Sequence, residues 1–348
     1  MNESPEYVRL SWAAAMTLGF EPGRFYRDAK LYCINLLLTY NDGCKGSCSY
    51  CGLAANRREE FKSSVDSQSF IRVGWPTYPI EEVASRIPKV SHAERVCVSM
   101  VTHPRAYKDT LTVLETVSSK SNILLSALIT PTLVSKRIQF EELRDAGVDW
   151  IGIATDTATN GLFDKLRGAG VNGPHRWENY WEAIENATRA FEGVSVHLVA
   201  GLGETEKEMV GAIQKARDLG GDPHLFSFYP EEGSAMESHP QFPNSAYKRL
   251  QLARYLIVND LVRSDQLGFD GGERILDFGV EGGIIDDAIN SGTPFTTNGC
   301  PGKNGEVACN RPYSNCTPRQ AAAGELRNYP FHPTVEDIQN IKQELKTY

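Results

Sequence analysis

Residues 41–52 read N-D-G-C-K-G-S-C-S-Y-C-G and place three thiols, Cys44, Cys48 and Cys51, at the spacing C-x3-C-x2-C. This stretch follows an apolar run at 34–38 that predicts a buried strand. Three cysteines this close together cannot share one face of a regular helix or strand, but a glycine-rich loop can fold them around one inorganic core. Thiolates bind iron–sulfur clusters, and a four-iron cluster with three cysteine ligands leaves one iron open to a further ligand.

Structural zinc is the main alternative for these three thiols. A structural zinc site has four protein ligands, which usually come as two separated pairs. The loop offers three cysteines, and no histidine lies within 40 residues on either side of it. The spacing therefore favours an iron–sulfur cluster over zinc.

The composition is that of an ordinary globular protein, with 41% hydrophobic and 23% charged residues among 348. The net charge of −8 argues against nucleic acid as a partner, because proteins that bind the phosphate backbone usually carry a basic surface. No apolar run approaches the roughly 18 residues of a membrane span, so no membrane partner is expected. The first residues, M-N-E-S-P-E-Y, lack the basic and then apolar order of a signal peptide, and we expect a cytoplasmic location.

Strand-like and helix-like segments alternate along the chain, which is typical of a parallel sheet covered by helices. The predicted strands lie at 33–40, 95–101, 123–130, 150–155, 195–201, 225–230, 266–269 and 294–297. The predicted helices lie at 4–20, 80–87, 105–118, 137–146, 176–192, 205–219, 245–263 and 281–290. Eight strands in this order predict an α/β barrel of the TIM type, with functional sites at the carboxyl ends of the strands. A partial barrel of six strands is the alternative, because the last two predicted strands are short and polar.

We expect three segments along the chain. Residues 1–30 form an N-terminal helical extension, residues 31–298 form the barrel, and residues 299–348 form a C-terminal segment with a helix. On the predicted strand at 195–201, alternation turns Ser195, His197 and Val199 into the barrel, where His197 is interpreted as a core histidine.

A second group of cysteines, Cys300, Cys309 and Cys316, lies in the C-terminal segment at the spacing C-x8-C-x6-C. Glycine and proline again punctuate the stretch, which predicts an auxiliary iron–sulfur cluster, with zinc or unliganded thiols as the alternatives. Because it follows the last predicted strand, we expect it at the same mouth of the barrel as the first loop. Cys33 and Cys97 lie singly in strand-like runs and are interpreted as small buried apolar side chains.

The C-x3-C-x2-C spacing, with Tyr50 just before the last cysteine, resembles the signature of the radical S-adenosylmethionine (SAM) superfamily. The resemblance implies a [4Fe-4S] cluster whose open iron is chelated by the amino and carboxylate groups of SAM. It also implies that an electron from the cluster cleaves the sulfonium and releases a 5′-deoxyadenosyl radical.

Further stretches resemble biotin synthase, a member of that superfamily, in the same order along the chain. They are R-V-C-V-S-M-V at 95–101, A-T-D-T at 154–157, G-L-G-E-T at 201–205 and Y-P-E-E-G-S-A-M at 229–236. By this resemblance Asp156 contacts the SAM ribose and Tyr229 lies beside the adenine. Arg176, with His175 as its rival, meets the SAM carboxylate. Ser99, aided by Thr102, replaces the G-G-E that usually receives the SAM amino group.

A narrower resemblance, to the two-subunit lipoyl synthases, rests on four more stretches. They are R-F-Y-R-D-A-K at 24–30, W-P-T-Y-P at 75–79, C-N-R-P-Y at 309–313 and N-Y-P at 328–330. It implies a sulfurtransferase that inserts sulfur at unactivated C–H bonds of a protein-bound octanoyl chain, with the auxiliary [4Fe-4S] cluster as the sulfur donor. The implied partners are an octanoylated lipoyl-carrier protein, a related second subunit and a low-potential electron donor.

Two other functions remain open. One is a radical SAM enzyme that acts on a small molecule and uses the auxiliary cluster as an electron relay. The other is an iron–sulfur carrier without catalysis, although a carrier needs no SAM pocket and no chain of barrel length.

Overall fold

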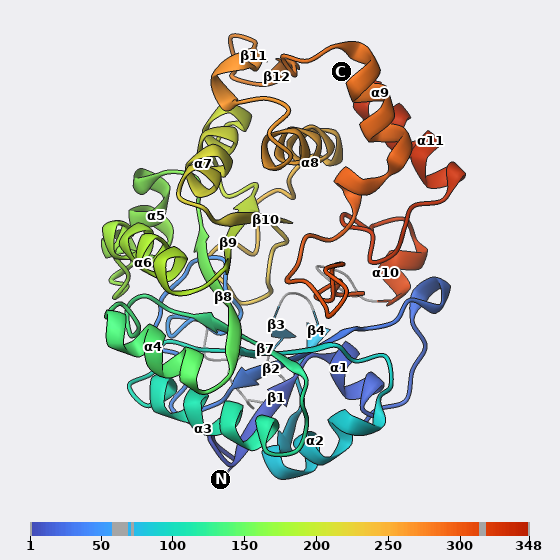
Figure 1. The fold of residues 1–348 in the computed structure, drawn as a ribbon. Coiled ribbons are helices and arrows are strands. Elements are labelled where there is room, and N and C mark those ends of the chain that lie inside the picture. The colour runs from blue at the N-terminus through green and yellow to red at the C-terminus, as the bar shows by residue number, and fades with distance from the viewer. Residues whose placement is uncertain (1, 58–68, 71–72, 313–317, 347–348) are drawn as a thin grey trace.

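The computed structural model describes residues 2–57, 69–70, 73–312 and 318–346. In this part of the chain, eight strands form one sheet in the order β10-β9-β8-β7-β6-β2-β1-β5 (Figure 1). The six parallel strands are β2 (Cys33–Leu38), β6 (Arg95–Ser99), β7 (Leu124–Ile129), β8 (Val148–Asp156), β9 (Gly193–Ala200) and β10 (Asp222–Ser227). β1 (Tyr7–Leu10) pairs antiparallel with both β2 and β5 (Thr77–Pro79). The predicted α/β barrel fold is confirmed, and hydrogen bonds between the described strands leave the sheet open between β10 and β5.

The two outer strands of the sheet differ from those predicted. Residues 266–269 end in β11 (Gly268–Phe269), which pairs with β12 (Ile275–Asp277) in a separate two-stranded sheet. Residues 293–295 form a short 3-10 helix, η6 (Thr293–Phe295), because Pro294 has no N–H to donate to a strand. The sheet reaches eight strands through β1 and β5 instead.

The predicted helix at 4–20 is wrong in its first half. Residues 7–10 form β1, because Val8 and Leu10 alternate with polar neighbours and are fully buried against β2. The helix proper, α1 (Trp12–Thr17), begins after Ser11, whose hydroxyl accepts the N–H of Ala14 at 3.2 Å.

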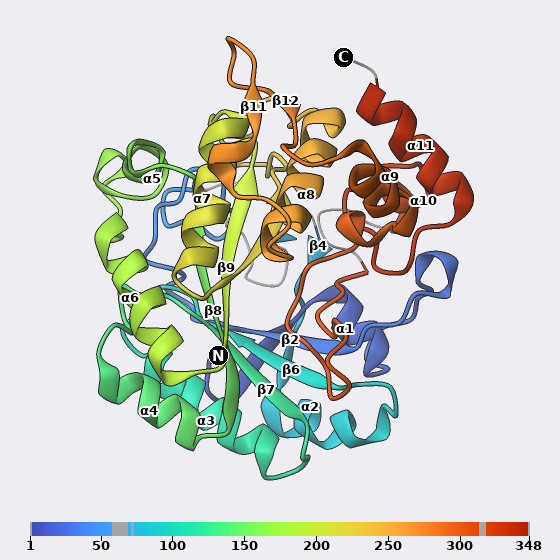
Figure 2. The same cartoon turned by 45° about the horizontal axis from the view of Figure 1, so that its top comes forward.

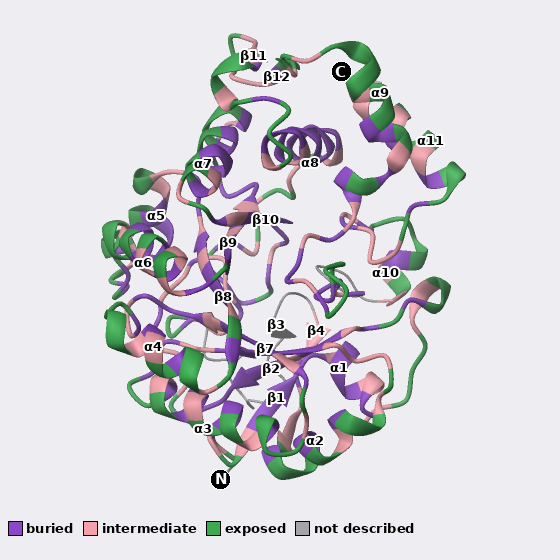
Figure 3. Ribbon diagram, in the orientation of Figure 1, coloured by how far each residue is buried: buried purple, intermediate pink, exposed green. Residues whose placement is uncertain are grey.

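Helices cover the outer face of the sheet, as the alternation predicts (Figures 1 and 2). They are α2 (Ile80–Arg86), α3 (Ala106–Ser118), α4 (Arg137–Asp145), α5 (Asn160–Leu166), α6 (Trp177–Ala190), α7 (Glu206–Asp218) and α8 (Asn244–Val258). The predicted capping box at the start of α7, between Thr205 and Glu208, is confirmed. α8 is buried along most of its length, since it packs on α7, β10 and the C-terminal helix α11 (Val335–Lys346) (Figure 3). No helix in the described residues is long and apolar enough to cross a membrane.

The C-terminal segment returns to the barrel after α9 (Gly282–Ser291) and precedes α10 (Pro318–Ala322). On one side Asn298 Oδ1 accepts the N–H of Leu225 in β10 at 3.5 Å. On the other side the Asn310 amide donates to the carbonyl of Lys30, just before β2, at 2.7 Å. This segment therefore spans the open side of the sheet, between its last parallel strand and its first.

Candidate active site

A cavity of about 330 Å³ occupies the inside of the barrel. Its walls come from alternate positions of the parallel strands, which point inward because successive side chains of a strand lie on opposite faces. The inward residues are Asn35 and Leu37 of β2, Cys97 and Ser99 of β6, Ser126 and Leu128 of β7, Ala154 and Asp156 of β8, and Ser195, His197 and Val199 of β9. The predicted inward set on β9 is confirmed.

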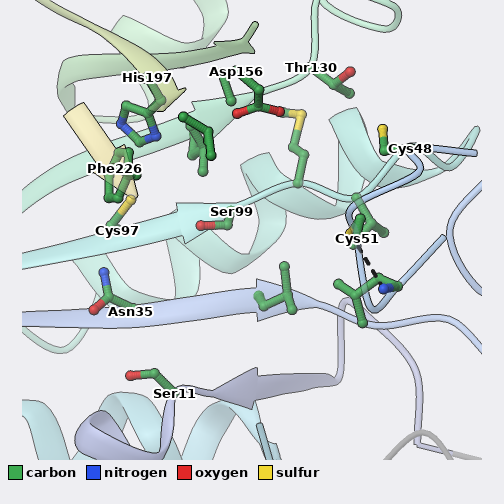
Figure 4. Close-up of a pocket in the computed structure, with 18 of the residues that line it drawn as sticks. Ser11, Asn35, Cys48, Cys51, Cys97, Ser99, Thr130, Asp156, His197 and Phe226 are labelled. Carbon is green, nitrogen blue, oxygen red and sulfur yellow. Dashed lines mark hydrogen bonds between the residues drawn. The ribbon is translucent and has the colours of Figure 1, made fainter. Parts of the chain in front are cut away.

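The three cysteines of the first loop line one end of this cavity, past the carboxyl end of β2. Figure 4 labels Cys48 and Cys51 at this end. The backbone N–H of Gly46 donates to Cys44 Sγ at 3.3 Å, and that of Leu53 donates to Cys51 Sγ at 3.4 Å. Burial raises the pKa of Cys51, and the hydrogen bond from the N–H of Leu53 acts against that rise. Three free thiols that face one cavity, two of which receive backbone N–H groups, fit a three-cysteine iron–sulfur cluster.

An acidic residue at the end of β8 lines the cavity beside this loop. Asp156 has φ 62°, a left-handed conformation that turns its carboxylate toward the cavity after an irregularity in the β8–β9 register. Tyr50 donates its hydroxyl to Asp156 Oδ2 at 2.5 Å, and Arg167 donates to the same oxygen at 2.7 Å. Burial raises the pKa of Asp156, while Arg167 and Tyr50 act in the opposite direction. Tyr50 and Asp156, both predicted as SAM contacts, thus lie together at the cavity.

Arg167 is the site residue that sequence reasoning missed. It follows α5, it is 5% exposed, and it also donates to the carbonyls of Ala154 and Thr155 at 2.7 and 3.0 Å. Nothing in the local sequence marks Arg167, because these partners lie on β8 and the Tyr50 hydroxyl beside them comes from the cysteine loop. Only the fold brings them together.

Arg176, predicted to meet the SAM carboxylate, lies at the start of α6 with an exposed side chain. Its guanidinium donates to the carbonyls of Gly173 and His175, at 3.1 and 2.7 Å, and it does not line the cavity. Its rival His175 does line the cavity. The role of Arg176 stays a prediction, with Arg167 as the arginine that the fold places at the wall.

His175 is held in a neutral form. Its Nδ1 lies 2.7 Å from the hydroxyl of Thr132 and 2.9 Å from that of Tyr180. Burial lowers the pKa of His175 to about 3, with help from the charges of Arg167 and Arg176. The other ring nitrogen faces the cysteine loop, since a Cβ built on Gly46 would lie 3.0 Å from it.

Of the remaining residues and stretches predicted to bind SAM, some line the cavity and others do not. Ser99, Thr102 and Tyr229 line the cavity. The G-L-G-E-T stretch does not: Gly201 and Gly203 have φ of 104° and 121°, which favours glycine. Glu204 accepts the N–H groups of Gly201 and Leu202 at 2.6 and 3.0 Å, so this stretch forms a closed turn before α7.

The opposite end of the cavity, which we call the floor, carries a second group of thiols. Cys33, Cys300 and Cys309 are buried together, with Cys97 packed against them. The Asn35 amide lies 3.7 Å from Cys33 Sγ and 3.8 Å from Cys309 Sγ. Cys33 is fully buried, as expected for a small apolar side chain, and both Cys33 and Cys97 lie beside the thiols of the C-terminal segment.

The position predicted for the second group is wrong. Cys33 is the first residue of β2, so the floor lies at the amino ends of the strands, across the barrel from the first loop. The reason is that residues after η6 fold back inside the open side of the sheet rather than continuing an eighth strand. Cys316, the third predicted ligand, lies outside the described residues.

Figure 4 shows the two ends in one view, with Cys48 and Cys51 at one side of the cavity and Cys97 near His197 and Phe226 at the other. The seven described cysteines are all free thiols. Within the described residues, no three Cys, His, Asp or Glu side chains are grouped to bind one metal ion.

Comparison with known proteins shows which proteins this chain is similar to. The profile of the Radical SAM superfamily matches residues 38–216, just over half of the chain. HydG, a maturase of the [FeFe]-hydrogenase, is similar in structure with 16% identity and a TM-score of 0.51, over 66% of this chain and 51% of HydG. SuiB from Streptococcus suis, solved with SAM bound, has 14% identity and a TM-score of 0.47, over 65% of this chain and 48% of SuiB.

No curated protein matches the sequence. The chain spans about half the length of HydG, and at 16% identity the two share a fold alone. The narrower resemblance to biotin synthase and the lipoyl synthases is not confirmed by these comparisons. The wider resemblance, to the superfamily, is confirmed by the profile match. The chain belongs to the radical SAM superfamily, whose members bind SAM and a [4Fe-4S] cluster.

Proposed function

We propose that the protein is a radical SAM sulfurtransferase, one component of a two-subunit lipoyl synthase. Its substrate is an octanoyl chain on a lipoyl-carrier protein, its partner is a related second subunit, and a low-potential donor supplies electrons. In this proposal a second, auxiliary [4Fe-4S] cluster provides the inserted sulfur.

The observation that carries the proposal is one cavity with thiols at both ends. Cys44, Cys48 and Cys51 line one end, and Cys300 and Cys309 line the floor. A substrate between them has a radical source on one side and a sulfur source on the other. Sulfur insertion needs this arrangement, since the carbon radical must react with a sulfur atom before it reacts with any other group.

The part of the cavity between the two ends suits an alkyl chain. Leu37, Leu128, Val199 and Phe228 line it from four different strands or strand ends. Apolar walls stabilise a buried acyl chain by about 25 cal/mol per Å² of surface removed from water. They also keep water away from a reactive radical.

When bound, SAM and its cluster would supply a carbon radical that can take a hydrogen atom from an unactivated carbon, which no side-chain base can deprotonate. The chain's own residues position the groups. Asp156, held by Tyr50 and Arg167, offers carboxylate oxygens to the ribose hydroxyls. Ser99 and Thr102 offer hydroxyls to the SAM amino group. His175 stays neutral and adds no charge beside the loop.

A second candidate is a radical SAM enzyme that acts on a small polar molecule, with the auxiliary cluster as an electron relay. The polar side chains near the floor favour it, since Asn35, Ser126, Ser195 and His197 all face the cavity. A polar substrate could bind there by hydrogen bonds that an octanoyl chain cannot make.

The test uses anaerobically reconstituted protein with SAM, dithionite, the second subunit and an octanoyl-lysyl carrier. We expect 5′-deoxyadenosine, a thiolated carrier, and loss of iron from one cluster as product forms. The control is the same mixture with Cys48→Ala, which should give neither product.

Each other outcome points to a different function. Formation of 5′-deoxyadenosine with both clusters intact and no thiolated carrier contradicts sulfur insertion and favours the relay. Absence of 5′-deoxyadenosine under all conditions contradicts both enzyme proposals and leaves an electron carrier.

A further inference from the structure

We propose that Cys33, Cys97, Cys300 and Cys309 are the complete ligand set of the second iron–sulfur cluster. This assignment deepens the proposed function and rests on its need for a second cluster. It replaces the ligand set predicted from spacing, in which Cys300 and Cys309 were joined by Cys316.

The first support is that separate parts of the chain bring these thiols to one place. Cys33 opens β2, and Cys97 lies inward on the neighbouring strand β6, where it is paired in register with Asn35. Cys33 and Cys97 therefore face the barrel interior from adjacent strands, two register positions apart. Cys300 and Cys309 reach the same point from the C-terminal segment.

The second support is a turn that fixes Cys300 and Cys309 as a pair. The N–H of Cys309 donates to the carbonyl of Cys300 at 3.1 Å, so the two cysteines lie side by side at the base of the turn between them. Gly299 makes this approach possible, because a Cβ there would lie 2.2 Å from the carbonyl oxygen of Cys309. Backbone packing this close leaves no room for any other residue.

The third support is a buried arginine that anchors this turn to the sheet. Arg95, the first residue of β6, is fully buried and donates to the carbonyl of Pro301 at 2.7 Å. Its two terminal nitrogens donate to the carboxylate of Asp149 at 2.6 and 2.7 Å. A fully desolvated guanidinium is costly unless its hydrogen bonds are complete, so the position of the turn is tightly specified.

The fourth support is a set of unused donors around the thiols. Trp150 packs against the cysteine group, and its buried ring N–H has no partner among the described residues. The buried Nε of Arg311 has none either, and the guanidinium of Arg311 lies over Phe226, which lines the cavity with Cys309. An unpaired buried donor is costly. The sulfides and thiolates of a cluster would accept these hydrogen bonds, as sulfur atoms of bound clusters commonly do.

Zinc and inert thiols are the competing explanations. Among the described residues, neither the floor thiols nor the loop thiols are grouped as the ligands of a single metal ion. Inert cysteines would require neither the buried Arg95 anchor nor the unpaired donors of Trp150 and Arg311. Measurement of the bound metal separates all three.

The experiment isolates the floor by replacing Cys44, Cys48 and Cys51 with alanine in the full chain. After anaerobic reconstitution this background should bind about four irons and about four sulfides per chain. Adding Cys33→Ala, or Cys97→Ala, should lower both to less than about a quarter of the background value. Adding Cys316→Ala, the matched control, should leave both unchanged.

Cys33→Ser addresses the chance that alanine variants fail to fold. Circular dichroism would show that this variant keeps its helices, and Mössbauer spectra should then show a changed iron environment in the floor cluster. Iron that is unaffected by all changes at Cys33 and Cys97, iron lost with Cys316→Ala, or bound zinc without sulfide would each overturn the proposal. Because none of these readouts measures sulfur insertion, a protein with this ligand set but without sulfur insertion would contradict the proposed function alone.

Discussion

The two thiol groups of this barrel are assembled in opposite ways. The loop group, Cys44, Cys48 and Cys51, comes from one short stretch of sequence. The floor group comes from two strands and a C-terminal turn, and its members are far apart in sequence, from Cys33 to Cys309. The first group is therefore defined by local spacing and the second by the fold. Each can be removed without the other, which makes the comparison open to experiment.

The largest expected effect separates the two groups by reaction. Cys48→Ala should reduce SAM cleavage to the level without enzyme, because the step depends on the cofactor that the loop holds. Cys309→Ala should leave reductive cleavage of SAM within about a factor of ten while thiolated product disappears. The measurement is 5′-deoxyadenosine per chain by chromatography, with dithionite as reductant. Equal loss of 5′-deoxyadenosine in both variants would mean that the two groups form one functional unit.

The next effect concerns the arginine that supports the loop end. Arg167→Met leaves the buried Asp156 carboxylate without its main cation, and breaking a buried ion pair costs about 3–5 kcal/mol in the free energy of unfolding. Arg176→Met removes only local hydrogen bonds of an exposed side chain and should cost less than about 0.5 kcal/mol. Urea unfolding of cluster-free protein measures both values.

The same pair of variants shows which of the two arginines binds SAM. If Arg167 is the relevant residue, Arg167→Met weakens SAM binding and Arg176→Met leaves the dissociation constant unchanged. A SAM affinity that falls only with Arg176→Met would restore the sequence-based prediction for Arg176. Equilibrium binding to the reconstituted protein gives this answer independently of stability.

A smaller effect tests the anchor of the floor. Arg95→Met loses three hydrogen bonds, to Pro301 and Asp149, but leaves Asp149 partly exposed to water. We expect a loss of about 2–3 kcal/mol in the free energy of unfolding, in line with charged hydrogen bonds. Iron bound at the floor should fall while iron bound at the loop stays. The control is Arg137→Met, whose exposed pair with Glu141 contributes about 0.3–0.5 kcal/mol.

The sequence was sufficient for features that depend on neighbouring residues. Spacing alone marked Cys44, Cys48 and Cys51, and the apolar runs located β2, β6 and β7 to within two residues of their amino ends. The capping box of α7 was equally readable, because both of its residues lie within one turn.

The sequence was insufficient where contacts join distant segments. Arg167 carries no local signal, and its importance comes from Asp156 and Tyr50 on other elements. Cys33 and Cys97 look like ordinary strand cysteines until the C-terminal turn is placed beside them. Sequence spacing grouped Cys300 with Cys309 and Cys316, and the role of Cys316 stays a prediction because it lies outside the described residues. Spacing could not add the two thiols that β2 and β6 place beside Cys300.

The smallest predicted effect is the pH dependence of the loop end. An unfolded histidine titrates near pH 6.5, whereas burial lowers the pKa of His175 to about 3. Between these values the unfolded chain binds one more proton than the folded chain at this residue, so acid favours unfolding. Lowering the pH from 7 to 5 should therefore cost about 2 kcal/mol through His175 alone. Urea unfolding of cluster-free protein at the two pH values measures it.

His175→Gln makes that contribution specific, because glutamine can keep a hydrogen bond to Thr132 or Tyr180 and has no proton to gain. The variant should lose about 2 kcal/mol less than the wild-type protein between pH 7 and pH 5. His197 at the floor, whose pKa is also lowered by burial and by His224, adds the same sign of dependence in both proteins and cancels in the difference. An unchanged pH dependence in His175→Gln would show that His175 accepts a proton in the folded state. The loop end of the cavity would then be open to water, unlike the buried thiols of the floor.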